Sequence, residues 1–132
     1  MPLIAVAFTT LMVVCVMSQI VVPTYADSDS VKSLISAADA GGYKDDKIFC
    51  LHTVSHNAEF YGAGRLVRSV DGTQRRFNSV QELVDEMKSK GLQEALVLMP
   101  DAYTKEMPIY EMIVPTVIGD NGELAIVRFL LK

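Results

Sequence analysis

Residues 47–54 read KIFCLHTV, a run of β-forming residues with apolar side chains at both odd and even positions. A strand with one face in water alternates apolar and polar residues, whereas a strand covered on both faces is almost continuously apolar. The run therefore predicts a central strand of a parallel sheet. Residues 95–99, ALVLM, repeat this pattern and stop at Pro100, which cannot donate a ladder hydrogen bond.

Two segments on either side of the first strand place apolar residues at positions i, i+3, i+4 and i+7, the spacing of one buried helix face. These residues are Val31, Leu34, Ile35 and Ala38 in the first segment, and Val80, Leu83, Val84 and Met87 in the second. The first helix is expected to end at the glycine pair 41–42. The second is expected to begin with a capping box over residues 79–82 and to end at Gly91.

The remaining elements are shorter. Strands are expected over 66–70 and 73–77, a loop or short helix over 56–64, and a terminal hairpin over 114–118 and 124–131. Pro108 interrupts a further helical pattern. Helices that alternate with apolar strands are typical of an α/β sandwich. The sequence thus predicts one small α/β domain over 31–132, with a mostly parallel sheet and a C-terminal hairpin whose last strand is interior.

Residues 2–22, PLIAVAFTTLMVVCVMSQIVV, carry no charge, and every Lys, Arg, Asp and Glu lies at or beyond Asp27. About 20 apolar residues at roughly 1.5 Å per residue match the roughly 30 Å hydrocarbon core of a bilayer. The segment therefore predicts a transmembrane helix over 2–22, followed by a linker over 23–30 that supplies helix caps. A single-pass membrane protein is expected, with its soluble domain on the extracytoplasmic side.

A cleaved signal peptide is the competing interpretation of the same segment, because the small residue Ala26 precedes Asp27 at a suitable cleavage position. A signal peptide ordinarily has a basic n-region and an apolar core of about 7–15 residues, and residues 1–3 carry no cation. The length of the apolar segment and the lack of a cation before it favour a spanning helix over a cleaved signal peptide. The missing cation would be natural in the last span of a longer membrane protein, whose upstream loops hold the charges.

Composition excludes some partners. The chain of 132 residues leaves room for one soluble domain after the apolar segment. Its formal net charge of −4 comes without a run of Lys or Arg, which argues against nucleic acid as the partner. Cys15 lies in the apolar segment and Cys50 in a predicted buried strand, so no disulfide between them is expected.

His52, His56 and Glu59 form the one cluster of ligand-type residues in the sequence. Two histidines four residues apart converge on a metal ion when both lie on one helix, but His52 belongs to the predicted strand and His56 follows it. A sheet role for His52 and a loop-capping role for His56 are therefore preferred to a metal site or a small enzyme built on the cluster. No metal or other cofactor is expected.

Residues 56–65 follow the carboxyl end of a predicted strand, where open α/β sheets gather their ligands. The candidate binding residues are His56, Glu59, Tyr61 and Arg65. Tyr61 and Arg65 could hold an anionic or sugar group. They could equally form a packed ring and a surface ion pair.

Several short motifs follow the apolar segment in a fixed order. They are Phe60-Tyr61, Gly64-Arg65-Leu66-Val67, Ser79-Val80-Gln81-Glu82-Leu83, Ala95-Leu96-Val97-Leu98 and Gly122-Glu123-Leu124-Ala125-Ile126-Val127. Together they resemble the C-terminal end of polytopic glycosyltransferases, the family of the protein O-mannosyltransferases and the bacterial lipid A aminoarabinose transferases. These enzymes use a polyprenyl-phosphate-linked sugar, and their bacterial members often end in a small α/β domain outside the cytoplasm. The resemblance covers this whole chain but only the tail of such an enzyme.

The catalytic acidic residue of that family lies in the first extracytoplasmic loop, and nothing in this chain corresponds to it. The resemblance therefore implies a membrane-anchored, non-catalytic C-terminal domain that packs over the extracytoplasmic face and helps shape acceptor access. Its expected partners are the lipid bilayer and the upstream transmembrane helices. The alternative function is a secreted or periplasmic module that binds a small ligand and is released after Ala26.

Overall fold

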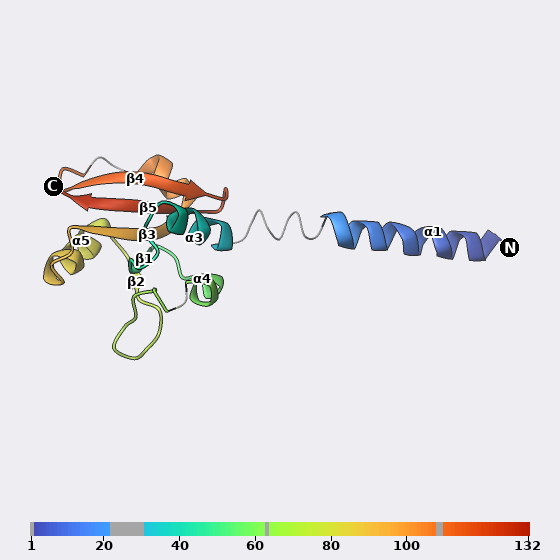
Figure 1. The fold of residues 1–132 in the computed structure, drawn as a ribbon, viewed down its shortest axis with the longest axis horizontal. Helices are drawn as coiled ribbons and strands as arrows, with labels where there is room; N and C mark the ends of the chain where they lie inside the picture. The colour runs from blue at the N-terminus through green and yellow to red at the C-terminus, as the bar shows by residue number, and fades with distance from the viewer. Residues whose placement is uncertain (1, 22–30, 63, 108–109) are drawn as a thin grey trace.

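The computed structural model describes residues 2–21, 31–62, 64–107 and 110–132. A five-stranded sheet forms the centre of the α/β domain, in the strand order β2-β1-β3-β5-β4 (Figure 1). The strands are β1 (Ile48–Leu51), β2 (Arg76–Phe77), β3 (Glu94–Pro100), β4 (Ile113–Asp120) and β5 (Leu124–Leu131). The helices of this domain are α3 (Val31–Ala40), α4 (His56–Tyr61), α5 (Val80–Ser89) and α6 (Asp101–Glu106).

The sheet is mixed. β1 pairs in parallel with β2 and β3, whereas β5 pairs antiparallel with β3 and β4. The α/β class and the C-terminal hairpin are confirmed. The expectation of a mostly parallel sheet is wrong, because the hairpin adds its strand β5 directly against β3. β5 is paired on both sides, as its nearly continuous apolar sequence predicted.

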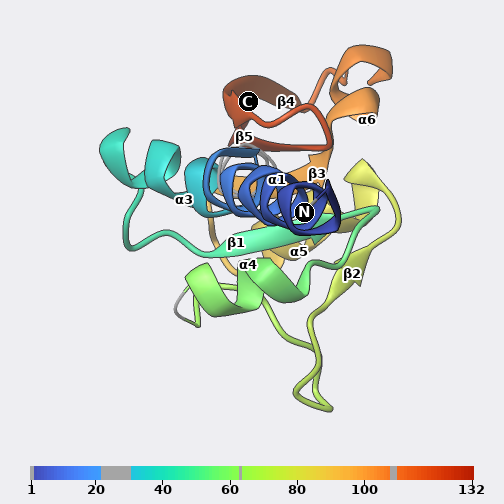
Figure 2. The same ribbon diagram turned by 90° about the vertical axis from the view of Figure 1, so that its right-hand side faces the viewer.

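The segment between α4 and β2 leaves the sheet and projects from the domain as a long loop (Figures 1 and 2). The strand expected over 66–70 is absent there. Leu66 makes an isolated parallel bridge to Ile48, and Arg68 makes an isolated antiparallel bridge to Gln74. Of the strand expected over 73–77, β2 keeps two residues. Leu66 and Val67 of this segment are buried in the two apolar clusters, and the residues beyond them supply surface rather than sheet.

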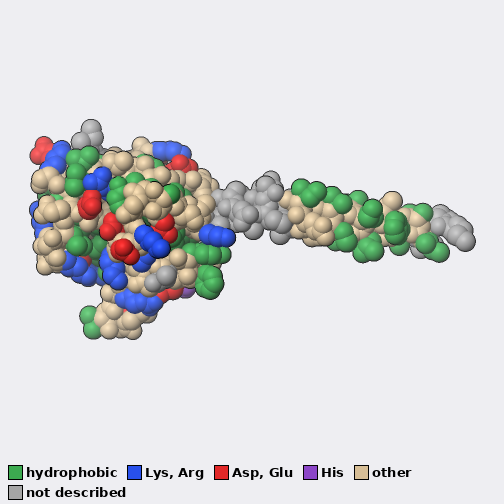
Figure 3. Space-filling view, viewed as in Figure 1, with side chains coloured by type: hydrophobic (Ala, Val, Ile, Leu, Met, Phe, Trp, Pro, Cys, Tyr) green, Lys and Arg blue, Asp and Glu red, His purple; other side chains and the backbone are tan. Residues whose placement is uncertain are grey.

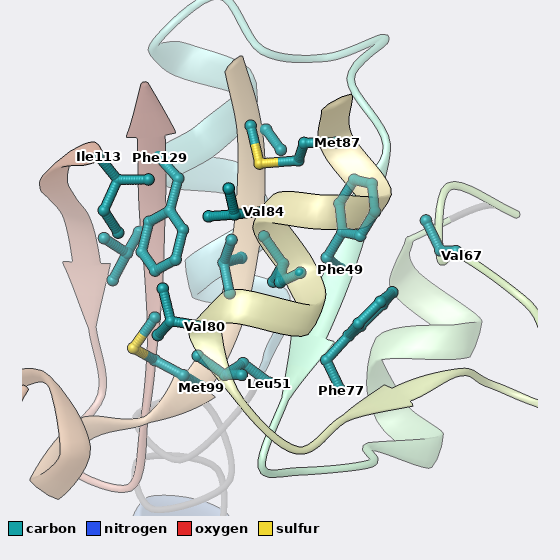
Figure 4. Packing of buried hydrophobic residues seen from close by; sticks show 14 of the residues in the cluster. Phe49, Leu51, Val67, Phe77, Val80, Val84, Met87, Met99, Ile113 and Phe129 are labelled. Carbon is teal, nitrogen blue, oxygen red and sulfur yellow. The ribbon is translucent and has the colours of Figure 1, made fainter. Parts of the chain in front are cut away.

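Apolar side chains fill both faces of the sheet. One cluster lies between the sheet and α5 and includes Phe49, Phe77 and Phe129 (Figure 4). The second cluster packs α3 and α4 against the opposite face. The apolar positions predicted for the two long helices are all buried: Val31, Leu34, Ile35 and Ala38 in α3, and Val80, Leu83, Val84 and Met87 in α5. The helical spacing in the sequence is thus confirmed by the packing.

Ser79 caps α5, as the sequence predicted. The Ser79 hydroxyl accepts a hydrogen bond from the backbone N–H of Glu82 at 3.2 Å. The Glu82 carboxylate in turn accepts one from the backbone N–H of Asn78 at 3.1 Å, one residue earlier than in an ideal capping box. After the helix, Gly91 has a φ of 67°, a left-handed conformation in which a residue with a side chain would be strained.

The N-terminal apolar segment forms two shorter helices rather than one span. α1 (Pro2–Val16) is α-helical, and η1 (Met17–Val21) continues it as a π-helix. The 15 residues of α1 extend about 22 Å at 1.5 Å per residue, short of the roughly 30 Å core of a bilayer. Across the residues described, we find no helix with the length and apolarity needed to cross a membrane. The predicted transmembrane helix over 2–22, and with it the single-pass membrane protein with an extracytoplasmic domain, is therefore wrong.

α1 projects away from the α/β domain, and its visible face carries uncharged side chains (Figures 1 and 3). Its large apolar residues, such as Phe8 and Leu11, are exposed. The hydroxyls of Thr9 and Thr10 donate to backbone carbonyls one turn earlier in the helix. The predicted linker over 23–30, its helix caps and the possible cleavage position after residue 26 lie outside the described residues.

Candidate functional site

His52 turns the chain at the carboxyl end of β1. Its φ of 58° lies in the left-handed region, which is uncommon for a residue with a side chain. The backbone N–H of His52 donates to the carbonyl of Phe77 at 2.9 Å. Its imidazole ring packs edge-on against the ring of Tyr103 in α6, with centroids 4.5 Å apart. His52 therefore joins β1 to β2 and α6.

α4 begins at His56, four residues after His52, and carries three of the predicted binding residues, His56, Glu59 and Tyr61. The Ser55 hydroxyl accepts a hydrogen bond from the backbone N–H of Ala58 at 3.2 Å, so Ser55 takes the capping role that the sequence assigned to His56. His56 and Glu59 lie three residues apart on the helix and are therefore neighbours on its surface. Ala58 is buried in the cluster beneath α3, which fixes the face that α4 turns to the solvent.

A pocket of about 290 Å³ lies between α4 and the projecting loop. It is lined by Val54, His56, Glu59, Arg68, Thr73 and Gln74. We call it the α4 pocket. Its volume is at the lower end of the range of ligand pockets, about 300–1,000 Å³. The α4 pocket is therefore large enough for one small molecule.

Gln74 ties the projecting loop to α4. Its side-chain amide donates to the backbone carbonyl of Ser55 at 2.9 Å and to the carboxylate of Glu59 at 2.8 Å, and its oxygen accepts from the Ser55 N–H. Arg68 forms an ion pair with the same Glu59 carboxylate and donates to the carbonyl of Gly72 at 2.6 Å. The charges of Arg68 and Glu59 thus balance within the pocket, and both side chains are held in place.

Arg65 lies in the scaffold and does not line the α4 pocket. Its guanidinium donates to the Asp39 carboxylate at 2.7 Å and to the backbone carbonyls of Asp46, at 2.9 Å, and of Tyr43. Only 12% of the Arg65 side chain is exposed. These bonds join α3, the segment before β1 and the segment after α4, so the guanidinium is engaged in structural contacts.

Phe60 and Tyr61 form an aromatic pair at the end of α4. Their rings are nearly perpendicular, with centroids 5.1 Å apart. Phe60 is 80% exposed and Tyr61 40%. Phe60 lies one turn beyond His56, which lines the α4 pocket, on the same face of the helix. Phe60 belongs to the Phe60-Tyr61 motif but was not among the predicted binding residues. A residue two positions from buried Ala58 nevertheless points away from the core once the segment is helical.

The structure therefore separates the predicted binding residues into three environments. His56 and Glu59 both line the α4 pocket, Tyr61 pairs with Phe60 at the end of α4, and Arg65 is part of the scaffold. Within the described part of the chain, no three His, Cys, Asp or Glu side chains come together as a possible metal site. His52 in particular does not join His56 and Glu59, because its ring packs against α6.

A second cavity, of about 340 Å³, lies beside β4. Its lining is mainly apolar: Thr104, Met107, Tyr110, Ile113, Val114, Pro115 and Lys132. Burial raises the pKa of Tyr103 to about 12, together with a hydrogen bond that its hydroxyl donates to the neighbouring phenol of Tyr110. At neutral pH Tyr103 is therefore a neutral phenol that contributes packing rather than charge.

Cys50 is unsuited to nucleophilic chemistry, because it lies fully buried in β1 and burial raises the pKa of its thiol to about 11. At pH 8 we expect only the exposed Cys15 to react rapidly with a chromogenic disulfide reagent. Cys50 should react after the chain is unfolded in guanidinium chloride. Rapid reaction of both thiols in the native protein would contradict this assignment.

The same thiol makes stability depend on alkaline pH. The folded state keeps the Cys50 proton up to a pKa of about 11, whereas the unfolded chain releases it at the ordinary value of 9.0. The thiol therefore contributes its full stabilisation below pH 9 and loses it as the pH rises toward 11. Urea unfolding at pH 8 and at pH 10 measures the loss, and Cys50→Ala should show a smaller one.

Comparison of the chain with models of protein families, with curated proteins and with solved structures finds no match. The α4 pocket is the candidate site that the geometry supports. Its polar side chains are held by hydrogen bonds and an ion pair, and an exposed aromatic ring lies beside them. Such an arrangement can bind a small polar molecule without covalent chemistry.

Proposed function

We propose that this chain is a non-catalytic C-terminal domain of, or related to, a glycosyltransferase that uses a lipid-linked sugar donor. Its role there is to shape access of the acceptor to the enzyme. This role does not require α1 to cross a membrane. One observation supports the proposal. Most of the short motifs that resemble this family lie in the helices and strands that form the scaffold of a single α/β domain.

Each of these motifs serves a different element. Arg65 connects α3 to the segments around β1, and Ser79 begins α5. Residues 95–98 lie in β3 and residues 124–127 in β5, at the centre of the sheet. Motifs of this kind specify a stable shape rather than a reactive group. The residues that resemble the family are therefore structural. A domain of this kind can bind or position another molecule through a site on its surface.

The surface feature available for such a role is the α4 pocket with Phe60 beside it. Glu59 is oriented by both Gln74 and Arg68, and these contacts keep the pocket ordered. Phe60 exposes most of its ring to solvent, where a ligand could reach it. Contact between this surface and an acceptor would guide the acceptor without a chemical step in this domain.

Two activity measurements test the proposal. The full chain, incubated with a polyprenyl-phosphate sugar and an acceptor, is expected to transfer no sugar by mass spectrometry, and transfer by the chain alone would contradict a non-catalytic role. In the second, residues 31–132 replace the corresponding C-terminal domain of a bacterial member of that family. We expect transfer above the level of the domain deletion. The matched control carries Leu34→Asp, which places a charge in the core beneath α3 and should restore nothing.

A separate small-ligand-binding module is the second candidate function, and the volume of the α4 pocket favours it. The two candidate functions predict different results when residues 31–132 replace the C-terminal domain of the bacterial enzyme. A free-standing binding module would bind its ligand but would leave the enzyme as inactive as the domain deletion does. A replacement that restores transfer would exclude the second candidate.

A further inference from the structure

We infer that the α4 pocket binds one neutral sugar unit, whose ring stacks on the exposed face of Phe60. This rests on the proposed function and names the ligand class of the same site. Three properties of the site lead to this class of ligand: its balanced charge, its mixture of donors and acceptors, and the aromatic ring beside it.

The charge balance favours a neutral ligand. Arg68 is the one guanidinium lining the described pocket, and it is already paired with Glu59. Arg65, the other cation predicted to bind a ligand, is engaged by Asp39 and two backbone carbonyls. An anionic ligand would have to compete with the Glu59 carboxylate for Arg68. A ligand without charge meets no such competition.

The polar groups of the pocket match hydroxyl groups, which both donate and accept hydrogen bonds. A carboxylate has about four acceptor sites, and the contacts described for Glu59 come from two donors, Gln74 and Arg68. The Thr73 hydroxyl donates to Asp71 at 2.7 Å, which leaves its oxygen able to accept. His56 adds an exposed imidazole at the pocket wall. The pocket lining thus offers a carboxylate, a hydroxyl and an imidazole to the hydroxyl groups of a ligand.

Phe60 supplies the apolar surface that one side of a sugar ring requires. The faces of a pyranose carry C–H groups, whose weak positive charge is attracted to the negative face of an aromatic ring. Phe60 is 80% exposed, so most of its ring surface stays open to solvent although the ring contacts that of Tyr61. Phe60 also lies one turn after His56, a residue that lines the pocket, on the same face of α4. One ligand can therefore contact the ring and the polar groups together.

The test is a backbone-amide NMR titration of the full chain. A zwitterionic detergent without a sugar headgroup prevents self-association through the exposed apolar side chains of α1. The probes are methyl α-D-mannopyranoside and, separately, inorganic phosphate. We expect the mannoside to shift the amides of residues 54–60 and 68–75 in a saturable way, with a Kd on the order of 1–10 mM. Phosphate should leave these amides unchanged.

Three variants separate stacking from general apolar contact. Phe60→Ala should weaken mannoside binding about fivefold, within the range measured for aromatic contacts. Phe60→Leu should weaken it as much, because leucine keeps an apolar side chain but has no π face. Val117→Ala is the matched control, since it removes an exposed apolar side chain from β4, on the far edge of the sheet, and should leave binding unchanged.

The outcomes that overturn the inference are distinct from those that overturn the proposed function. Absence of saturable mannoside shifts would overturn the sugar site, and shifts caused by phosphate at the same amides would identify an anion site instead. Wild-type affinity of Phe60→Leu would overturn the stacking role. None of these results depends on whether the chain transfers sugar or restores an enzyme. Conversely, transfer by the chain alone would overturn the proposed function and leave a bound sugar in place.

Discussion

Phe49→Ala is expected to remove most of the stability of the α/β domain. Phe49 is 0% exposed on β1, and its ring lies 5.6 Å from that of Phe77 in the cluster beneath α5. Truncating a buried phenylalanine costs about 3–5 kcal/mol, through lost burial and the cavity left behind. A domain of this kind has a total stability of only about 5–15 kcal/mol. Urea unfolding followed by circular dichroism measures the change.

Phe60→Ala is the matched control, because it is the same substitution at a side chain that is 80% exposed. A surface change of this kind should alter the free energy of unfolding by less than about 0.5 kcal/mol. The two variants therefore differ only in burial. Equal unfolding midpoints for Phe49→Ala and Phe60→Ala would show that the packing between the sheet and α5 is not what stabilises the domain.

Arg65→Ala should have the second-largest effect, a loss of about 2–4 kcal/mol in the free energy of unfolding. The substitution leaves Asp39 without its ion pair and removes the donor from the backbone carbonyls of Tyr43 and Asp46. Unpaired polar groups in a partly buried site cost more than the hydrogen bonds themselves contribute. Thermal and urea unfolding of the full chain both measure this loss.

Two further variants define the cause. Arg65→Lys should recover only part of the loss, because an ammonium group cannot reproduce the fork geometry that reaches three acceptors. Arg76→Ala removes an exposed arginine from β2 and should change stability little. If Arg65→Ala were as stable as Arg76→Ala, the bonds of Arg65 would not be structural. The guanidinium would then again be a candidate for ligand binding.

The elements that could be predicted from the sequence are those with local causes. The apolar spacing of α3 and α5 predicted their buried faces, and Ser79 marked the start of α5. Helix periodicity and capping involve residues within a few positions of one another, so a single sequence contains the whole signal. The same holds for β1 and β3, whose apolar runs predicted burial on both faces.

The N-terminal prediction failed because it counted apolar residues and not backbone geometry. Residues 2–22 have the composition of a span, yet the helix changes from α to π at Met17. Hydropathy depends on side chains alone. It does not show whether a backbone N–H bonds to the carbonyl four residues earlier, as in an α-helix, or five residues earlier, as in a π-helix. The length of a continuous α-helix is therefore a property of the structure and not of the composition.

The candidate site was predicted in part. His56 and Glu59 were placed correctly beyond the carboxyl end of β1, because strand ends follow from strand predictions. Arg68 replaces Arg65 as the arginine of the pocket. Both arginines lie in the segment between α4 and β2. Which one reaches Glu59 depends on the path of the projecting loop, which no local pattern determines.

Local patterns in the sequence were enough to predict the α/β class, the buried faces of α3 and α5, and the hairpin. Three features follow from the packed domain instead: β5 lies between β3 and β4, Arg65 belongs to the scaffold, and the Phe60 ring is exposed on α4. Local elements arise from contacts between near neighbours in the chain. Strand order and pocket walls join residues far apart in sequence, and their partners are chosen only when the whole domain packs.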